Sequence, residues 1–207
     1  PSPLREDMIL KETTNPYGET KAMSERILMD TVKVNPDFSA TLLRYFNPVG
    51  AHPSGLIGED PNGIPNNLLP YVNRVAAGEL PCLSIFGDDY DTVDGTGVRD
   101  YIHVVDLADA HMAAMRYLRA GGTTDVFNLG NAVGHSVLEV IASVERVTGR
   151  KVPVVYGARR PGDADRLVAS SEKACRVLGW APSRGDIDTI VRDAWTWHQA
   201  HPKGYAR

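Results

Sequence analysis

Tyr17 and Lys21, near the start of the chain, are residues whose types and spacing could do chemistry. Asn15 suits a helix N-cap and Pro16 suits the first helical position, so the pair is expected on one face of a helix. A free tyrosine has a pKa near ~10, and a nearby ammonium group favours the phenolate. Lowering that pKa to about 7, as acid–base catalysis would need, takes roughly 4 kcal/mol. The spacing alone is a weak signal, because most tyrosines at helix starts are packed aromatic side chains.

A further candidate stands at the end of a predicted strand. Residues 38–46 are mostly apolar without regular alternation, which is typical of a parallel strand buried on both faces. Asn47, Pro48 and Gly50 stop this strand. Because ligands of open α/β sheets bind beyond the carboxyl ends of strands, Asn47 is well placed to contact one.

The rest of the sequence alternates predicted strands with predicted helices. We expect strands at 38–46, 83–86, 99–104, 127–129 and 152–156. We expect helices at 16–34, 66–77, 106–118, 136–148, 171–178 and 186–200, with Asp106 and Ser136 as N-caps. This order favours an α/β fold, a partial doubly wound parallel sheet followed by a smaller α/β lobe. The expected domains are 1–50 and 51–207, and the second can return strands and helices to the first sheet.

Composition argues against several classes of function. The net charge of −4 gives no basic field for nucleic acid, and no apolar run is long enough to cross a membrane. Cys82 and Cys175 match no metal-site spacing and are typical of the reduced thiols of a cytoplasmic protein. No glycine-rich turn links a strand to a helix as a dinucleotide-binding fold requires. Taken alone, the chain lacks the loop that holds a dinucleotide pyrophosphate.

Four longer strings carry a resemblance that runs over nearly all 207 residues. They are NPYG at 15–18, LRYFNPVGAH at 43–52, GIPNNL at 63–68 and DGTGVRDYIHV at 94–104. In this order they resemble the UDP-glucose (UDP-galactose) 4-epimerases of the extended short-chain dehydrogenase/reductase family. The resemblance implies a Rossmann-like sheet and NAD as cofactor. The family's glycine fingerprint would lie upstream of Pro1, so we expect this chain to be the C-terminal portion of such an enzyme.

The resemblance also implies a mechanism for the tyrosine–lysine pair. Tyr17 would take the proton of the sugar 4-hydroxyl while hydride passes from C4 to NAD, and the 4-keto sugar would turn over and take the hydride back. Lys21 would lower the pKa of Tyr17 and hydrogen-bond the nicotinamide ribose. Tyr45 and Phe46 would bind the cofactor near its nicotinamide. The implied activity is the interconversion of UDP-galactose and UDP-glucose by the complete protein.

Part of the implied substrate site would hold the base and the pyrophosphate region. Asn47 would contact the pyrophosphate region, and the helix start at Asn66, Asn67 and Leu68 would offer N–H groups to an anion. The strand residues implied to read uracil are Ser84, Ile85 and Phe86.

Later residues would complete the substrate site. Arg99 and Arg160 would clamp the diphosphate through bidentate contacts, and Asp163 would contact the ribose. Leu167 takes the place of a gate residue beside the sugar, where a bulky tyrosine restricts the pocket and a smaller side chain admits N-acetylated sugars. Since leucine is intermediate in size, we expect partial tolerance of UDP-N-acetylglucosamine. The family pattern also implies a homodimer packed through the first helix.

Other interpretations stay open. Without the resemblance, Arg99 would more often form a surface ion pair with Asp100 or Asp106, worth under ~1 kcal/mol. His103 and His111 are given no role, because single histidines are more often core or surface residues. Alternative functions are a nucleotide-sugar dehydratase or decarboxylase of the same family, and a UDP-sugar-binding module without catalysis.

Overall fold

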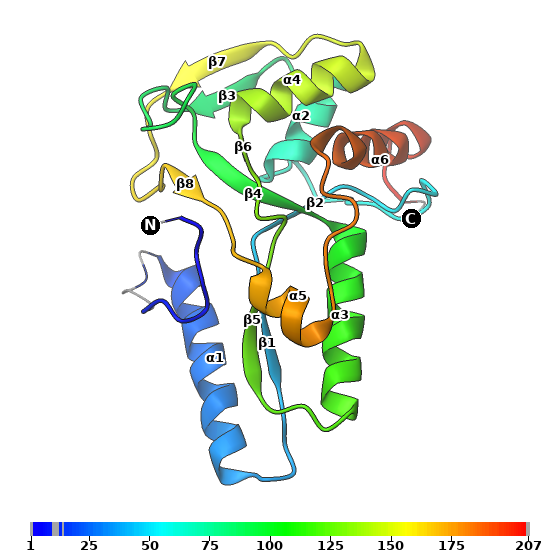
Figure 1. Cartoon of the computed structure of the whole chain (residues 1–207). Coiled ribbons are helices and arrows are strands. Elements are labelled where there is room, and N and C mark those ends of the chain that lie inside the picture. Colours follow the sequence, from blue (N-terminus) through cyan, green and yellow to red (C-terminus); the bar gives the residue numbers. More distant parts are fainter. Residues whose placement is uncertain (1, 10–12, 14, 206–207) are drawn as a thin grey trace.

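The structure, a computed structural model, describes residues 2–9, 13 and 15–205 (Figure 1). Its helices are α1 (Pro16–Val34), α2 (Leu68–Ala77), α3 (Val104–Arg119), α4 (Val137–Thr148), α5 (Glu172–Leu178) and α6 (Ile187–Ala200). Its strands are β1 (Thr41–Tyr45), β2 (Asn47–Val49), β3 (Leu83–Phe86), β4 (Val98–His103), β5 (Asp125–Leu129), β6 (Gly134–Ser136), β7 (Val154–Gly157) and β8 (Arg166–Leu167). Strands and helices alternate along the chain, which confirms the predicted α/β class.

The described strands form several small sheets. β1 and β5 pair in parallel, with Thr41 opposite Asp125 and Tyr45 opposite Leu129. β2 pairs in parallel with β4, which also pairs with β6 in the antiparallel and with β8 in the parallel sense. β3 and β7 form a separate parallel pair. The parallel pairs bring the carboxyl ends of strands that are distant in sequence to common edges.

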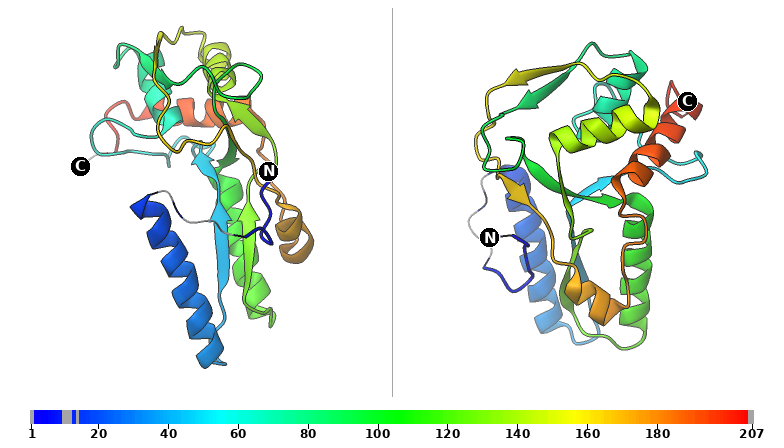
Figure 2. Two further views of the ribbon diagram at one scale, coloured as in Figure 1. Left: turned by 90° about the vertical axis from the view of Figure 1, so that its left-hand side faces the viewer. Right: turned by 45° about the horizontal axis from the view of Figure 1, so that its top comes forward.

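The β1–β5 pair lies between helices. α3 and α5 pack against it on one side, and α1 lies on the other (Figures 1 and 2). Phe127, Leu129 and Trp180 form the core under α3 and α5, each at most 5% exposed. Because β5, α3 and α5 come from beyond residue 51, part of the later chain joins the layer of β1. The division of domains at residue 50 stays a prediction.

A second core lies among α2, α4 and α6, next to the β3–β7 pair (Figure 1). Val72, Val144 and Ile190 are completely buried there. The predicted cap of α4 is confirmed: the Ser136 hydroxyl accepts from the Glu139 N–H, and the Glu139 carboxylate accepts from the Ser136 N–H. This cap fixes the start of α4 close to β4.

Helix α1 begins as the sequence predicts. The Asn15 side chain accepts a hydrogen bond from the Gly18 N–H, and Pro16 occupies the first helical turn. The 19-residue helix buries none of its residues, and Ile27 is 65% exposed. A bidentate ion pair from Arg44 to Glu25, at 2.6–2.7 Å, ties the helix to β1. Neither α1 nor any other helix in the described residues is both long and apolar enough to cross a membrane.

The single strand predicted at 38–46 is wrong in its bounds. The structure places β1 at Thr41–Tyr45 and begins a separate strand, β2, at Asn47. The break falls at Phe46, whose N–H still donates to the Leu129 carbonyl of β5. From Asn47 onward the backbone pairs with Tyr101 of β4 instead. The local hydrophobicity of the sequence continues through Phe46. It therefore cannot show that the chain changes its pairing partner there from β5 to β4.

The predicted cap of the helix after residue 104 is also wrong. α3 begins at Val104, and the His103 imidazole caps it by accepting from the Val105 N–H at 3.0 Å. Asp106 lies inside the first turn, where its buried carboxylate accepts from the N–H groups of Ser183 and Arg184. The Asp106 carboxylate, which we predicted would cap the helix locally, therefore binds backbone N–H groups that are distant in sequence. The short strands β6 and β8 were not predicted.

Candidate active site

A cavity of about 560 Å³ collects residues from both halves of the chain. Its wall is built from the N-terminal end of α1, Phe46 after β1, the strand β2, the start of α2, the strands β3 and β4, and the loop after β7. The residues that line it are Tyr17, Phe46, Asn47, Pro48, Val49, Asn66, Asn67, Leu68, Ser84, Ile85, Phe86, Tyr90, Gly97, Arg99, Tyr101, Val137, Arg160 and Asp163. Most of the residues predicted to bind substrate thus meet in one place.

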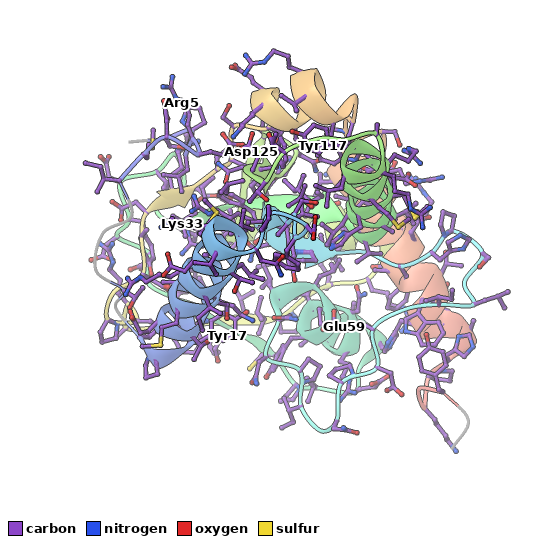
Figure 3. All side chains as sticks on the ribbon, turned by 90° about the horizontal axis from the view of Figure 1, so that it is seen from below. Arg5, Tyr17, Lys33, Glu59, Tyr117 and Asp125 are labelled. Atoms are coloured by element: carbon purple, nitrogen blue, oxygen red, sulfur yellow. The ribbon has the colours of Figure 1, made fainter. Side chains whose placement is uncertain are left out.

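Tyr17 is the residue of α1 that reaches this cavity. It is 73% exposed and lies at the N-terminal end of the helix, the opposite end from Lys33 (Figure 3). The Lys21 ammonium nitrogen lies 5.1 Å from the centroid of the Tyr17 ring. Since the two positions are four apart in a regular helix, the ammonium is held beside the phenol by the backbone itself. Lys21 does not line the cavity directly.

The end of β1 divides the predicted cofactor residues. Phe46 lines the cavity, and so does Asn47 after it. Tyr45 is 51% exposed and lies elsewhere, with its ring centroid 6.2 Å from that of His111 on α3. Neighbouring strand residues point to opposite faces, which accounts for the separation of Tyr45 from Phe46. The role proposed for Tyr45 in cofactor binding remains untested.

β3 and the loop after β7 form the end of the cavity that was predicted to read uracil. Ser84, Ile85 and Phe86 all border the cavity. The Arg160 guanidinium carbon lies 4.2 Å from the centroid of the Phe86 ring. An aromatic ring with a guanidinium over its face offers both a flat surface and a positive charge to a planar, anionic ligand.

Arg99 and Asp163, two of the residues predicted to bind substrate, lie close to each other. An Arg99 guanidinium nitrogen lies 3.7 Å from the Asp163 carboxylate, and another donates to the Ala164 carbonyl at 2.8 Å. The alternative pairing of Arg99 with Asp100 or Asp106 is wrong. Both carboxylates are buried, and Asp100 instead accepts from the backbone N–H groups of Asn131, Ala132 and Ala169. Burial raises the pKa of Asp100 above its usual range, against those hydrogen bonds.

The helix start at 66–68 faces the same space. Asn67 is the N-cap residue of α2 by position, but its side chain makes no cap and donates to the Glu59 carboxylate at 2.9 Å instead. The first N–H groups of α2 are therefore left without a side-chain cap, next to the cavity. Such groups favour an anion.

Leu167 joins Lys21 and Tyr45 as predicted residues outside the cavity lining, and several cavity residues were missed. Leu167 lies opposite Arg99 in the β4–β8 register but does not line the cavity. Tyr101 lies within the string DGTGVRDYIHV but was given no role. It is 4% exposed, and burial raises its pKa to about 12. No motif in the sequence marks Tyr90 or Val137 as a site residue, because they reach the cavity only when the chain folds.

Comparison with known proteins now decides the family. The sequence model described as "NAD dependent epimerase/dehydratase family" matches residues 1–130. This chain belongs to that family. The matched range contains the Tyr17–Lys21 helix, the helix start at 66–68 and Arg99, but ends before Arg160 and Asp163.

Individual members of the NAD dependent epimerase/dehydratase family extend the likeness to almost the whole chain. The UDP-glucose 4-epimerase of Bacillus subtilis is 52% identical over 99% of this chain and 60% of its own length. The UDP-glucose-4-epimerase of Stenotrophomonas maltophila, solved with NAD and formylated UDP-arabinopyranose, is 47% identical with a TM-score of 0.93, over 98% of this chain and 60% of the other. The Bifidobacterium longum UDP-glucose 4-epimerase, solved with NAD+ and UDP, has the same identity and TM-score over 99% and 61%. The chain therefore spans about 60% of the length of these relatives.

Proposed function

We propose that the complete protein interconverts UDP-galactose and UDP-glucose by transient oxidation at C4 of the sugar, with NAD as cofactor. The observation that carries the proposal is the position of Tyr17. It lines the same cavity as Phe86, Arg99, Arg160 and Asp163, which suit a uracil, a diphosphate and a ribose. The similar structures from Stenotrophomonas maltophila and Bifidobacterium longum, solved with NAD and with formylated UDP-arabinopyranose or UDP, support the same ligands.

The residues at the Tyr17 end fit the nicotinamide half of NAD. Phe46 provides a flat ring there, and Tyr17 a hydroxyl. Lys21 is exposed and forms no ion pair within the described part of the chain, so its three N–H donors can meet a ribose diol. NAD, when bound, supplies the hydride acceptor for the sugar C4. The chain has no glycine-rich loop, so its residues fit this half of the cofactor only.

In the proposed reaction Tyr17 moves the proton. Its phenol oxygen takes the proton of the sugar 4-hydroxyl as the C4–H bond breaks, and returns it when C4 is reduced on the other face. The Lys21 ammonium, 5.1 Å from the ring centroid, stabilises the phenolate that accepts this proton and that is restored when the proton is returned. A base on the first turn of a helix is held by its backbone and can serve both directions of transfer.

The rest of the cavity holds the nucleotide while the sugar turns. Arg99 and Arg160 would bind the diphosphate, Asp163 the ribose and Phe86 the uracil. Anchoring of this kind leaves the 4-keto sugar free to rotate without leaving the site. Binding energy from the unreacting nucleotide then serves the reaction at the sugar.

Two further features of the proposal concern the whole protein. We propose a homodimer packed through α1, since its exposed apolar residues Met23, Ile27, Leu28 and Met29 are uncovered in this chain. We also propose that the activity belongs to a reducing, cytoplasmic compartment, because Cys82 and Cys175 are both free thiols.

The direct test uses the complete product of the gene. Its bound NAD is measured after denaturation, and conversion of UDP-galactose to UDP-glucose is followed with a coupled dehydrogenase. Bound NAD with turnover supports the proposal. Bound NAD without turnover would favour another nucleotide-sugar reaction of the same family, and UDP binding without NAD would favour a binding module.

A further inference from the structure

The loop of residues 158–165 carries Arg160 and Asp163, two of the proposed nucleotide contacts. Its beginning is anchored where the Gly87 N–H donates to the Gly157 carbonyl at 2.9 Å. Its end is anchored where the Val98 N–H donates to the Asp165 carbonyl at 2.8 Å. Between these points the loop crosses exposed surface, so its middle needs a side-chain contact to keep one position.

Arg99 supplies one such contact near the end of the loop, through its hydrogen bond to the Ala164 carbonyl, and Arg159 supplies another near its beginning. The guanidinium carbon of Arg159 lies 3.9 Å from the centroid of the Tyr90 ring, and its Nη2 donates to the Asp165 carboxylate at 2.6 Å. A third partner, the Asp89 carboxylate, lies 3.7 Å from Nε. Tyr90 is 5% exposed and lines the cavity, whereas Arg159 does not. Arg159 therefore contacts Tyr90, a residue of the cavity wall, without itself lining the cavity.

The loop of residues 87–97, which carries Tyr90, is held in place by its own hydrogen bonds. The Asp94 carboxylate accepts from the N–H and hydroxyl of Thr96 at 2.9 and 2.8 Å, and from the Ser136 hydroxyl that also caps α4. The Tyr90 N–H donates to the Gly95 carbonyl at 3.0 Å. Gly95 has φ of 77°, and a Cβ there would lie 2.2 Å from the Asp88 carbonyl oxygen. The position of Tyr90 is thus fixed independently of the 158–165 loop.

We propose that Arg159 is a positioning residue for the nucleotide half of the substrate, and that its stack on Tyr90 holds Arg160 over Phe86 and Asp163 beside Arg99. This inference rests on the proposed function, because it names how the same site is kept ready for a nucleoside diphosphate. Arg159 acts through its neighbour Arg160. The guanidinium suits the task because it can stack on a ring and bond a carboxylate at the same time.

The test measures UDP binding to the complete protein by calorimetry. Arg159→Met keeps the length of the side chain and removes the guanidinium, and is expected to raise the dissociation constant of UDP about fivefold. Arg159→Lys, which keeps a cation near the ring and near Asp165, is expected to recover part of this loss. Arg116→Met, on the exposed side of α3, is the matched control and should bind UDP as the unsubstituted protein does.

A variant cycle separates positioning from general stability. In an Arg160→Met background, the Arg159→Met change should weaken UDP binding less than it does in the unsubstituted protein, because one of the two residues that Arg159 positions is gone. The KM for UDP-galactose should rise with Arg159→Met while kcat stays within about twofold. Unchanged UDP affinity in Arg159→Met, or an equal loss in both backgrounds, would overturn the inference. Failure of the unsubstituted protein to bind UDP would instead overturn the proposed function beneath it.

Discussion

Arg99 of β4 and Asp163 of the loop after β7 lie 3.7 Å apart, although they come from distant parts of the chain. The Asp163 carboxylate balances part of the charge of the Arg99 guanidinium. The Arg99 guanidinium also donates a hydrogen bond to the Ala164 carbonyl at 2.8 Å, so its position does not depend on Asp163 alone. These contacts hold a cationic side chain at the wall of the cavity.

Replacing Arg99 is the first prediction. Arg99→Met should raise the dissociation constant of UDP tenfold or more, since a hydrogen bond to a charged group is worth about 1.5–3 kcal/mol. Uridine, which lacks the diphosphate, should lose much less affinity. Calorimetry with both ligands measures the difference, and an equal loss for uridine and UDP would show that Arg99 does not contact the diphosphate.

A second prediction concerns His103, which is completely buried between β4 and α3. Burial lowers the pKa of this imidazole below its ordinary value, while Asp193, at 3.1 Å, acts in the opposite direction. Because the unfolded chain binds the proton more readily, stability is present above pH ~6.5 and falls as the pH drops below that value. His103→Asn keeps a helix-capping side chain and should flatten this fall, as thermal melts between pH 5 and 8 would show.

The matched control is His111→Asn, which changes an exposed histidine of α3, the helix that His103 caps. It should leave the pH dependence of the melting temperature unchanged. If His103→Asn retained the full dependence of the unsubstituted protein, another group would be responsible.

A third prediction concerns the contact between α4 and α6. The Asp188 carboxylate accepts from the Ser143 hydroxyl and the Arg146 guanidinium, and the Arg146 hydrogen bond, the largest cause, lowers its pKa to about 2. The stability that this group contributes is present above pH ~4 and is lost as the pH falls toward 2. Asp188→Asn should cost about 1 kcal/mol at neutral pH and little at pH 2, measured by urea unfolding at both. An equal cost at both values would contradict the assignment.

A fourth prediction concerns the sugar specificity. Leu167 lies opposite Arg99 in the β4–β8 register, and we expect it to permit some turnover of UDP-N-acetylglucosamine. Leu167→Tyr should reduce this turnover and retain that of UDP-galactose. Assays of both substrates with both proteins provide the test, and an inert acetylated substrate with the unsubstituted protein would refute the expectation.

Local signals in the sequence predicted local structure well. Asn15 and Ser136 cap their helices as expected, because capping depends on residues three positions away. His103 caps α3 although histidine is not a usual capping residue, since β4 runs straight into the helix and leaves no other side chain for the task. The break at Phe46 is set by strand pairing across the fold, which local patterns do not encode.

Most residues of the predicted site line one cavity, whereas the bounds of several elements differ from the prediction. Long ordered strings marked Phe86, Arg99 and their neighbours, and folding brings these residues to one cavity. Tyr90 and Arg159 were missed because each acts through a contact made only in the folded chain. Tyr45 and Leu167 lie outside the cavity lining, so their predicted roles rest on the resemblance alone.

The measurement that tests the account most directly is the turnover of UDP-galactose by Tyr17→Phe, made in the complete protein and compared with Tyr156→Phe. Tyr156 lies on β7, is 53% exposed and does not line the cavity, so its substitution controls for loss of a phenol hydroxyl. We predict that Tyr17→Phe lowers kcat by about 10²–10⁴-fold with UDP affinity retained, and that Tyr156→Phe has no effect. Turnover by Tyr17→Phe equal to that of the unsubstituted protein would show that Tyr17 is not the base.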